Sequence, residues 1–257
     1  MWSRPSSAPC EAWKARTDFS PPSNPVNFLQ DKIALVTGAD GGLGRAVTRA
    51  LLDAGALVVG VSRKIQQTDF PDPSFTAMRA ETSNPEAAVK MVDAVVARFG
   101  RIDILAHLVG GFAGGKTVAE TDDATFRLML DINLHSAFYV LRSVIPNMRK
   151  SGGGRIIAIG SRAAESPGPG VAAYSASKAA LVSLIQTVAL ENKDLAITAN
   201  VLLPGTMDTP ANRQAMPAAD ISKWVQPASV ASLIVWLAGP AGKDVSGAVI
   251  PVYGQSL

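Results

Sequence analysis

The stretch 35–47, LVTGADGGLGRAV, decides the fold of this chain. An apolar run ends just before Gly38, and a segment with helical spacing begins near Leu43. Between them, Gly38, Gly42 and Gly44 have the spacing TGxxxGxG. Glycines permit a tight turn and a close approach of backbone N–H groups to phosphate, and the positive end of the following helix favours that anion. The stretch predicts a strand–turn–helix unit that binds a dinucleotide, with an ordinary βα turn as the alternative.

The same alternation continues along the chain. Short β-branched runs are predicted as strands and amphipathic segments as helices, the longest helices at about 122–149 and 174–191. Seven strands are expected, at 32–38, 57–63, 75–80, 102–110, 154–161, 197–205 and 247–254. Strands that alternate with helices form right-handed βαβ units. We therefore expect an α/β fold of the Rossmann type, a doubly wound, mostly parallel seven-stranded sheet with helices on both faces, in a single domain.

Two segments depart from this pattern. Residues 1–28 are rich in Pro and Ser and lack the apolar core of a secretory signal, so we expect a disordered N-terminal extension before a dinucleotide-binding domain at 29–257. Residues 208–225 fit neither a helix nor a strand pattern. They are predicted to form a lid over the carboxyl ends of the strands, where such sheets bind ligands.

Composition excludes several classes of partner. The net charge is only +3 and there is no basic run, which disfavours nucleic acid. No apolar stretch reaches the ~20 residues of a membrane span. One cysteine, Cys10, and two distant histidines, His107 and His135, supply neither a disulfide framework nor a zinc site, so we expect no metal. The prediction is a cytoplasmic protein that acts on a small-molecule substrate.

The end of the second predicted strand selects the dinucleotide. An acidic residue there accepts hydrogen bonds from the ribose hydroxyls of NAD. This chain has Ser62, Arg63 and Lys64 instead, and two cations suit the 2′-phosphate of NADP. We therefore predict NADP(H), the alternative being a pair of solvated surface charges.

Five motifs together resemble the short-chain dehydrogenase/reductase family, over about 31–254. They are TGADGGLG (37–44), Asn133 in DINLHSAF, Ser161 in AIGS, the pair Tyr174 and Lys178 in YSASK, and PGTMDT (204–209). The resemblance implies a homo-oligomer, dimer or tetramer, formed through the long helices. It also implies that the cofactor contacts Gly38, Asp40, Gly42, Leu43, Gly44, Ser62, Arg63, Lys64, Glu81, Gly110, Tyr174, Lys178, Pro204, Gly205, Thr206 and Thr209.

The resemblance assigns chemistry to four residues. Tyr174 and Lys178 are four apart and share a helix face. A phenol has a pKa of ~10, and a neighbouring ammonium is expected to lower it, so Tyr174 is the predicted general acid/base. Lys178 is also expected to bind the nicotinamide ribose, Ser161 to hold the substrate oxygen, and Asn133 to hold a water of a proton relay. The alternatives are a core tyrosine, a surface lysine, a turn-capping serine and a hydrogen-bonded helix asparagine.

The chain departs from the family after the fourth strand. Most members have Asn-Asn-Ala-Gly there, whereas this chain has His107, Leu108, Val109 and Gly110. The first Asn usually braces the central strands, and His107 either replaces it by hydrogen bonding or is simply a packed residue. Glu81 stands where the family often has an Asp near the adenine.

We predict that the protein reduces a ketone or aldehyde, or oxidises the matching alcohol, by hydride transfer with NADP(H). Two segments, VGGFAGG (109–115) and 208–224, resemble dihydropteridine reductase, so reduction of a quinonoid pterin is the alternative. Ser62-Arg63 and Ser161 favour the carbonyl over the pterin. An NADP-binding sensor without catalysis is the non-enzymatic alternative.

Overall fold

The computed structural model describes residues 27–255, so the part of the expected extension at 1–26 lies outside the described residues. The seven predicted strands are present and pair in parallel in the order β3-β2-β1-β4-β5-β6-β7. They are β1 (Ile33–Thr37), β2 (Leu57–Ser62), β3 (Phe75–Arg79), β4 (Ile104–His107), β5 (Gly154–Ile159), β6 (Ile197–Pro204) and β7 (Val249–Val252). The doubly wound, single-domain Rossmann-type fold is confirmed, and the sheet is parallel throughout.

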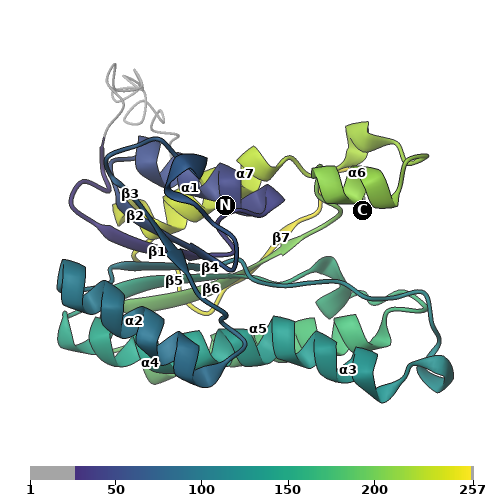
Figure 1. The fold of residues 1–257 in the computed structure, drawn as a ribbon. Coiled ribbons are helices and arrows are strands. Elements are labelled where there is room, and N and C mark those ends of the chain that lie inside the picture. The colour runs from purple at the N-terminus through teal and green to yellow at the C-terminus, as the bar shows by residue number, and fades with distance from the viewer. Residues whose placement is uncertain (1–26, 256–257) are drawn as a thin grey trace, which may run out of the picture.

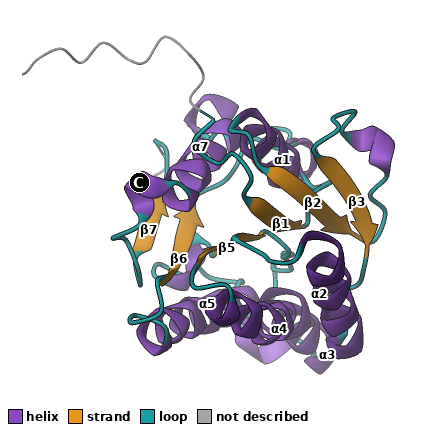
Figure 2. Cartoon of the chain, turned by 90° about the vertical axis from the view of Figure 1, so that its left-hand side faces the viewer, coloured by secondary structure: helices purple, strands orange, loops and turns teal. Residues whose placement is uncertain are grey.

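Helices cover both faces of this sheet (Figures 1 and 2). The α1 and α7 helices lie on one face, and α2, α4 and α5 lie on the other. Their bounds are α1 (Gly42–Asp53), α2 (Pro85–Phe99), α3 (Asp123–Leu130), α4 (Ser136–Lys150), α5 (Ala172–Glu191), α6 (Pro210–Ala215) and α7 (Pro227–Ala238). Within residues 27–255, no helix combines the length and apolarity needed to cross a bilayer.

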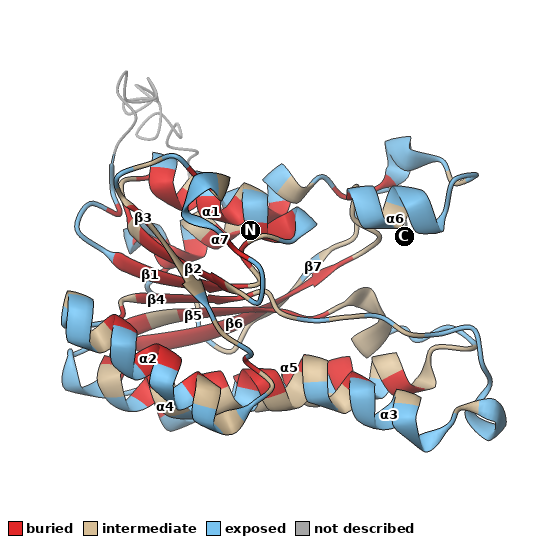
Figure 3. Cartoon of the chain, in the orientation of Figure 1, coloured by how far each residue is buried: buried red, intermediate tan, exposed pale blue. Residues whose placement is uncertain are grey.

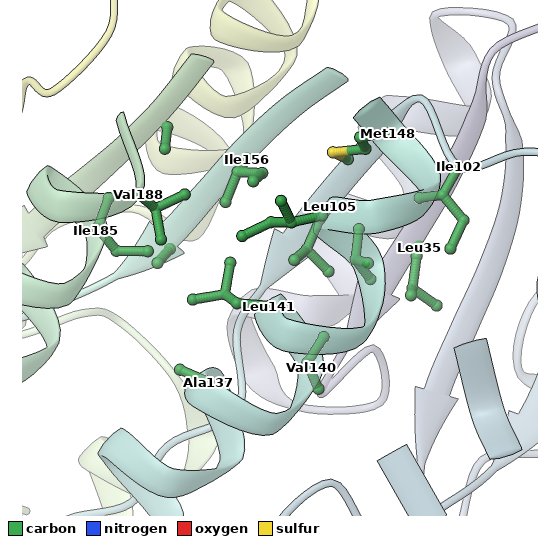
Figure 4. Packing of buried hydrophobic residues seen from close by; sticks show 14 of the residues in the cluster. Leu35, Ile102, Leu105, Ala137, Val140, Leu141, Met148, Ile156, Ile185 and Val188 are labelled. Atoms are coloured by element: carbon green, nitrogen blue, oxygen red, sulfur yellow. The ribbon is translucent and has the colours of Figure 1, made fainter. Parts of the chain in front are cut away.

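The central strands are buried on both faces, as Figure 3 shows by their red colour, whereas the edge strands β3 and β7 are partly exposed. Side chains alternate along β1: Ile33 and Leu35 pack under α2, α4 and α5, whereas Ala34 and Val36 pack under α1 and α7. Figure 4 shows Leu35 in the first of these two layers, among side chains of α4 and α5. Burial on both faces explains why the strands read as continuous apolar runs.

Two sequence predictions about helices are corrected. The segment 122–149 is not one α-helix, because a π-helical turn at Asp131–His135 separates α3 from α4. The lid segment is not devoid of regular structure, because it contains α6, with Thr209 as its N-cap and Pro210 in its first turn. A Thr-Pro pair is a helix-start signal that the pattern analysis missed.

The fold places the ends of several strands at one edge. The chain leaves β3 at the edge of the sheet and returns at β4 on the other side of β1, so the strand order reverses between β1 and β4. Ligands of open parallel sheets bind outside the carboxyl ends of the strands at such a reversal. The segments that follow β1, β2, β4, β5 and β6 therefore meet at the expected site.

Candidate active site

The glycine turn after β1 has the geometry expected for phosphate binding. Gly38 has a φ of +72°, which a side chain would strain, and a Cβ on it would lie 3.2 Å from the backbone of Leu108. A Cβ on Gly44 would overlap the carbonyl oxygen of Gly38. The turn leads directly into α1 at Gly42, and the first turn of this helix carries no acidic residue. The N-terminus of α1 is therefore suited to an anion.

The segment after β6 lies against this turn. The side chain of Thr209 occupies the space beside Gly42, because a Cβ there would come within 2.8 Å of the Thr209 methyl group. Met207 pairs with Val225 across a short parallel bridge, which ties the two ends of the lid together. The structure thus brings Thr209, one of the predicted residues of 204–209, to the glycine turn, and α6 follows from there (Figure 1).

The residues after β2 are placed as predicted, with one addition. The Ser62 hydroxyl accepts backbone hydrogen bonds from Lys64 (3.2 Å) and Ile65 (3.0 Å), which shapes the turn. The side chain of Arg63 is 76% exposed, and its guanidinium lies 3.6 Å from the Glu81 carboxylate. Two predicted cofactor residues from different strand ends therefore form an ion pair, which the sequence analysis did not anticipate.

Tyr174 and Ser161 meet at the carboxyl end of β5. A hydrogen bond joins the two side chains, and it lowers the pKa of the phenol. Burial has the larger effect and raises that pKa above its ordinary value of 10.0. The expectation that Lys178 lowers the Tyr174 pKa is therefore wrong for this structure, since desolvation of the phenolate dominates. Ser161 also caps a short 3-10 turn by accepting from Ala163 (3.2 Å), which is the turn-capping role considered as the alternative.

Lys178 is not a surface lysine. Its side chain is buried, and Nζ donates to the Ile159 carbonyl oxygen at 2.8 Å. Burial lowers the pKa of the ammonium from 10.5 to about 8. Nζ also lies near Gly110, where a Cβ would come within 3.0 Å of it. Within residues 27–255 Nζ has this single hydrogen-bond acceptor, which leaves two of its three N–H groups for a ligand.

Asn133 lies in the π-helical turn and is fully buried. Its amide accepts from the Gly111 N–H and donates to the Gly111 carbonyl, both at 3.0 Å. It also donates to Ser177 Oγ at 3.0 Å. Single π-turns inside helices commonly mark functional sites. The structure shows the hydrogen-bonded asparagine considered as an alternative, and it places that residue beside α5, which carries Tyr174 and Lys178.

His107 takes the place of the family's first Asn and is hydrogen-bonded as well as packed. Its ring nitrogens lie 3.0 Å from Thr37 Oγ1 and 3.4 Å from Ser136 Oγ. Burial, and secondarily the charge of Lys178, lowers the pKa of His107 to about 3. The ring therefore links β1 to α4 in its neutral form.

The structure adds residues that the sequence analysis did not single out. Phe112 packs edge-on against Tyr174, with ring centroids 5.0 Å apart, and yet is 68% exposed. Ser177 and Gly111 hold Asn133. The sequence did indicate that Phe112 belongs to the site, because core packing does not explain an isolated aromatic residue in a glycine-rich loop.

These features define a class of protein. The glycine turn, the segment 204–209 and the buried Lys178 fit a dinucleotide: the turn offers backbone N–H groups to phosphates, and Lys178 keeps donors for hydroxyls. A phenol hydrogen-bonded to a serine stands beside them. The fold and the site are those of a nicotinamide-dependent oxidoreductase.

Comparisons with known proteins give the family. The family described as short chain dehydrogenase matches residues 32–220, and this chain belongs to it. The chain is 30% identical to dehydrogenase/reductase SDR family member 4 of Bos taurus, over 98% of this chain and 97% of that protein. It is 28% identical to the 7alpha-hydroxysteroid dehydrogenase of Escherichia coli K12, over 88% and 94% of the two chains. Among solved structures, a Brucella melitensis 3-ketoacyl-(acyl-carrier-protein) reductase complexed with NADH has a TM-score of 0.81 at 24% identity, covering 89% of this chain and 100% of that one.

Proposed function

We propose that the protein is an NADP(H)-dependent carbonyl reductase that interconverts a ketone or aldehyde and the matching alcohol. The observation that carries this proposal is the Ser161–Tyr174 hydrogen bond at the carboxyl end of β5. A hydroxyl and a phenol that already share a hydrogen bond can both reach one oxygen atom of a substrate. Catalysis of this kind needs donors aimed at the oxygen on which charge develops.

Each of these groups has a separate role in the proposed reaction. The bound nicotinamide supplies the hydride that goes to the carbonyl carbon. Tyr174 donates its proton to the carbonyl oxygen, and Ser161 donates a hydrogen bond to the same oxygen. Because burial raises the pKa of Tyr174, the phenol keeps its proton at neutral pH and has one to donate when a carbonyl is reduced.

Lys178 and Asn133 support this step. The free N–H groups of Lys178 would hold the nicotinamide ribose. Asn133 fixes the loop at Gly111 by two hydrogen bonds and would hold a water through which the proton of Tyr174 is replaced. The two residues come from different elements, since Lys178 lies on α5 and Asn133 in the π-helical turn before α4.

The preference for NADP(H) rests on Arg63 and Lys64. Both are exposed at the carboxyl end of β2, where the adenosine ribose lies in this class of fold. Glu81 pairs with Arg63 and offsets part of its charge, so a 2′-phosphate competes with that carboxylate. The exposure of Arg63 makes such an exchange of partners easy.

Replacing Arg63 by Ala is expected to raise the KM for NADPH about 10- to 100-fold and to leave that for NADH nearly unchanged, because one charge-assisted hydrogen bond is lost. Arg98→Ala, which removes an exposed charge at the far end of α2, is the control. Steady-state kinetics with both cofactors makes the measurement. An equal change for the two cofactors would contradict the assignment.

Three exposed apolar side chains bear on the class of substrate. Phe112 presents an exposed ring beside Tyr174, and Met216 and Ile221 are exposed on the lid segment at 208–225. These side chains favour a bulky, cyclic carbonyl compound, as the similarity to a hydroxysteroid dehydrogenase also suggests. We further propose that 208–225 closes over the substrate as a lid.

The test of the function is NADPH and NADH oxidation by the purified protein with a panel of carbonyl compounds. The panel holds cyclic ketones, quinones, β-keto esters, 3-oxoacyl thioesters, aldehydes and a quinonoid dihydropterin. Turnover of cyclic carbonyl compounds with NADPH is the expected result. Turnover of the dihydropterin alone would replace the proposal by the pterin alternative, and tight NADPH binding without any turnover would favour the sensor.

We also propose a cytoplasmic homodimer or homotetramer. The helices α3, α4 and α5 expose the apolar side chains Phe126, Leu128, Phe138 and Leu190 on their outer surfaces. Exposed apolar residues on neighbouring helices favour association between copies. Light scattering on the purified protein tests the oligomeric state.

A further inference from the structure

His107 connects two layers of the molecule. It is the last residue of β4, and its ring is 1% exposed. On one side lies Thr37, the last residue of β1, and on the other Ser136, the first residue of α4. Both partners are fully buried hydroxyl residues. The imidazole thus spans from the centre of the sheet to the helix that carries the π-helical turn.

The donor and the acceptor of each hydrogen bond around His107 can be assigned. Ser136 Oγ lies 2.8 Å from the carbonyl oxygen of Ile132, which can only accept, so the serine proton points there. Toward His107, Ser136 Oγ can therefore only accept, and Nε2 of the ring carries the proton. A neutral ring has one N–H, so Nδ1 accepts from Thr37 Oγ1. The Leu108 N–H completes the chain by donating to Thr37 Oγ1 at 3.3 Å.

The neutral state of the ring is well supported. Burial is the main reason that the pKa of His107 falls to about 3, and the charge of Lys178 on α5 adds to it. The two residues that contact the ring nitrogens, Thr37 and Ser136, are uncharged. A protonated ring would also have to direct a second N–H at Thr37, which would then lose its role as donor.

This series of hydrogen bonds ends at a backbone carbonyl next to a residue of the candidate site. Ile132 lies inside the π-helical turn and directly precedes Asn133. The Asn133 amide holds Gly111 and Ser177, and Ser177 Oγ donates to the backbone carbonyl of Tyr174 at 2.7 Å. Hydrogen bonds therefore lead from β1 through His107 and Ser136 to Ile132, the backbone connects Ile132 to Asn133, and hydrogen bonds lead on from Asn133 through Ser177 to the start of α5.

We propose that His107 is a positioning residue, whose Nε2–H holds the π-helical turn through Ser136 and so places Asn133 against the loop after β4 and against α5. The effect on turnover rests on the proposed function, because it acts through Asn133 and Tyr174. The same ring makes a second contact, in which Nδ1 accepts from Thr37 and connects β4 to β1. This contact can be tested separately from the one at Nε2.

Two substitutions separate the hydrogen bond to Ser136 from the hydrogen bond to Thr37. The amide nitrogen of Gln can stand where Nε2 stands and donate to Ser136, whereas Asn reaches only the position of Nδ1 and the Thr37 side. His107→Gln is expected to keep kcat within about threefold of the wild type. His107→Asn is expected to lower kcat by on the order of 10- to 100-fold, with the KM for NADPH nearly unchanged, because misplaced groups slow the chemical step. His135→Gln makes the same exchange at an exposed position of the same turn and should leave kcat unchanged.

If His107→Asn is as active as His107→Gln, the proposal is overturned. The hydrogen bond to Thr37 alone would then be enough for full activity. A parallel rise in the KM for NADPH and loss of thermal stability in both variants would also overturn it, because it would indicate general loss of packing.

A second measurement needs no activity. The sequence contains only two histidines, so the imidazole signal that disappears in His107→Gln belongs to His107. Nitrogen NMR of the wild type should show this ring as the Nε2–H tautomer, unchanged between about pH 8 and pH 5. The Gly111 amide, which donates to Asn133, should exchange with solvent faster in His107→Asn than in His107→Gln.

These results separate the two proposals. An Nδ1–H tautomer, or equal Gly111 exchange in the two variants, would refute the role of His107. The expected tautomer and exchange in a protein that reduces no carbonyl compound would refute the proposed function and leave the positioning of Asn133 intact.

Discussion

Replacing Tyr174 by Phe is expected to lower kcat for carbonyl reduction by on the order of 10²- to 10⁴-fold, the usual effect of removing a positioned acid. The variant keeps the aromatic ring, so its packing against Phe112 should persist, and only the hydrogen bond to Ser161 is lost. NADPH affinity should stay nearly the same, because the buried Lys178 remains in place.

Steady-state kinetics and NADPH titration of the same preparation make this measurement. Tyr139→Phe is the matched control, since Tyr139 lies on α4 and its ring contacts those of His135 and Phe138. Residual turnover above about 1% of the wild type in Tyr174→Phe would remove Tyr174 from the role of acid.

Replacing Lys178 by Met is expected to lower kcat/KM by on the order of 10²-fold or more, because the hydrogen-bond donors that Lys178 offers to the cofactor disappear. Its second expected effect concerns stability. The Lys178 ammonium is buried, and its pKa is about 8 in the folded protein, against an ordinary lysine pKa of 10.5 in the unfolded chain. Below pH 8 both states are protonated, and the folded state carries the full cost of a buried charge.

Between about pH 8 and pH 10.5 the unfolded chain binds more protons at this position than the folded one, so Lys178 makes wild-type stability rise with pH in that window. Met cannot titrate and lacks this contribution. Urea unfolding at pH 7 and at pH 9.5 should therefore show the wild type gaining stability relative to Lys178→Met. The Ile159 carbonyl loses its hydrogen-bond donor in the variant, which changes the variant's free energy of unfolding by an amount that does not depend on pH. Lys150→Met, at an exposed position at the end of α4, should show no such change, and a pH-independent difference for Lys178→Met would contradict the buried-ammonium interpretation.

Local sequence patterns predicted the elements whose causes are local. The boundaries of α2 follow from Asn84, which caps the helix, from Pro85 in its first turn and from Gly100, which has a φ of +81° at its end. The glycine turn after β1 and the (i, i+4) relation of Tyr174 and Lys178 are likewise properties of short stretches. The parallel, doubly wound sheet follows from the alternation of strand and helix, since parallel neighbours require crossover connections.

Other features depend on contacts between distant parts of the chain. The π-helical turn at Asp131–His135 is invisible in a helical pattern, and the buried residues that surround it, among them His107 on β4 and Ser177 on α5, come from other elements. The ion pair of Arg63 with Glu81 forms only because β2 and β3 lie in register.

The sequence by itself therefore determined the order of the elements and the glycine turn, and it supplied the residues of the proposed catalytic group, because helix and strand periodicity and turn chemistry act over a few neighbours. The tertiary structure alone decided the direction in which the pKa values of Tyr174 and Lys178 shift. Burial raises the pKa of Tyr174 and lowers that of Lys178, and burial is the sum of contacts that no short stretch of sequence contains.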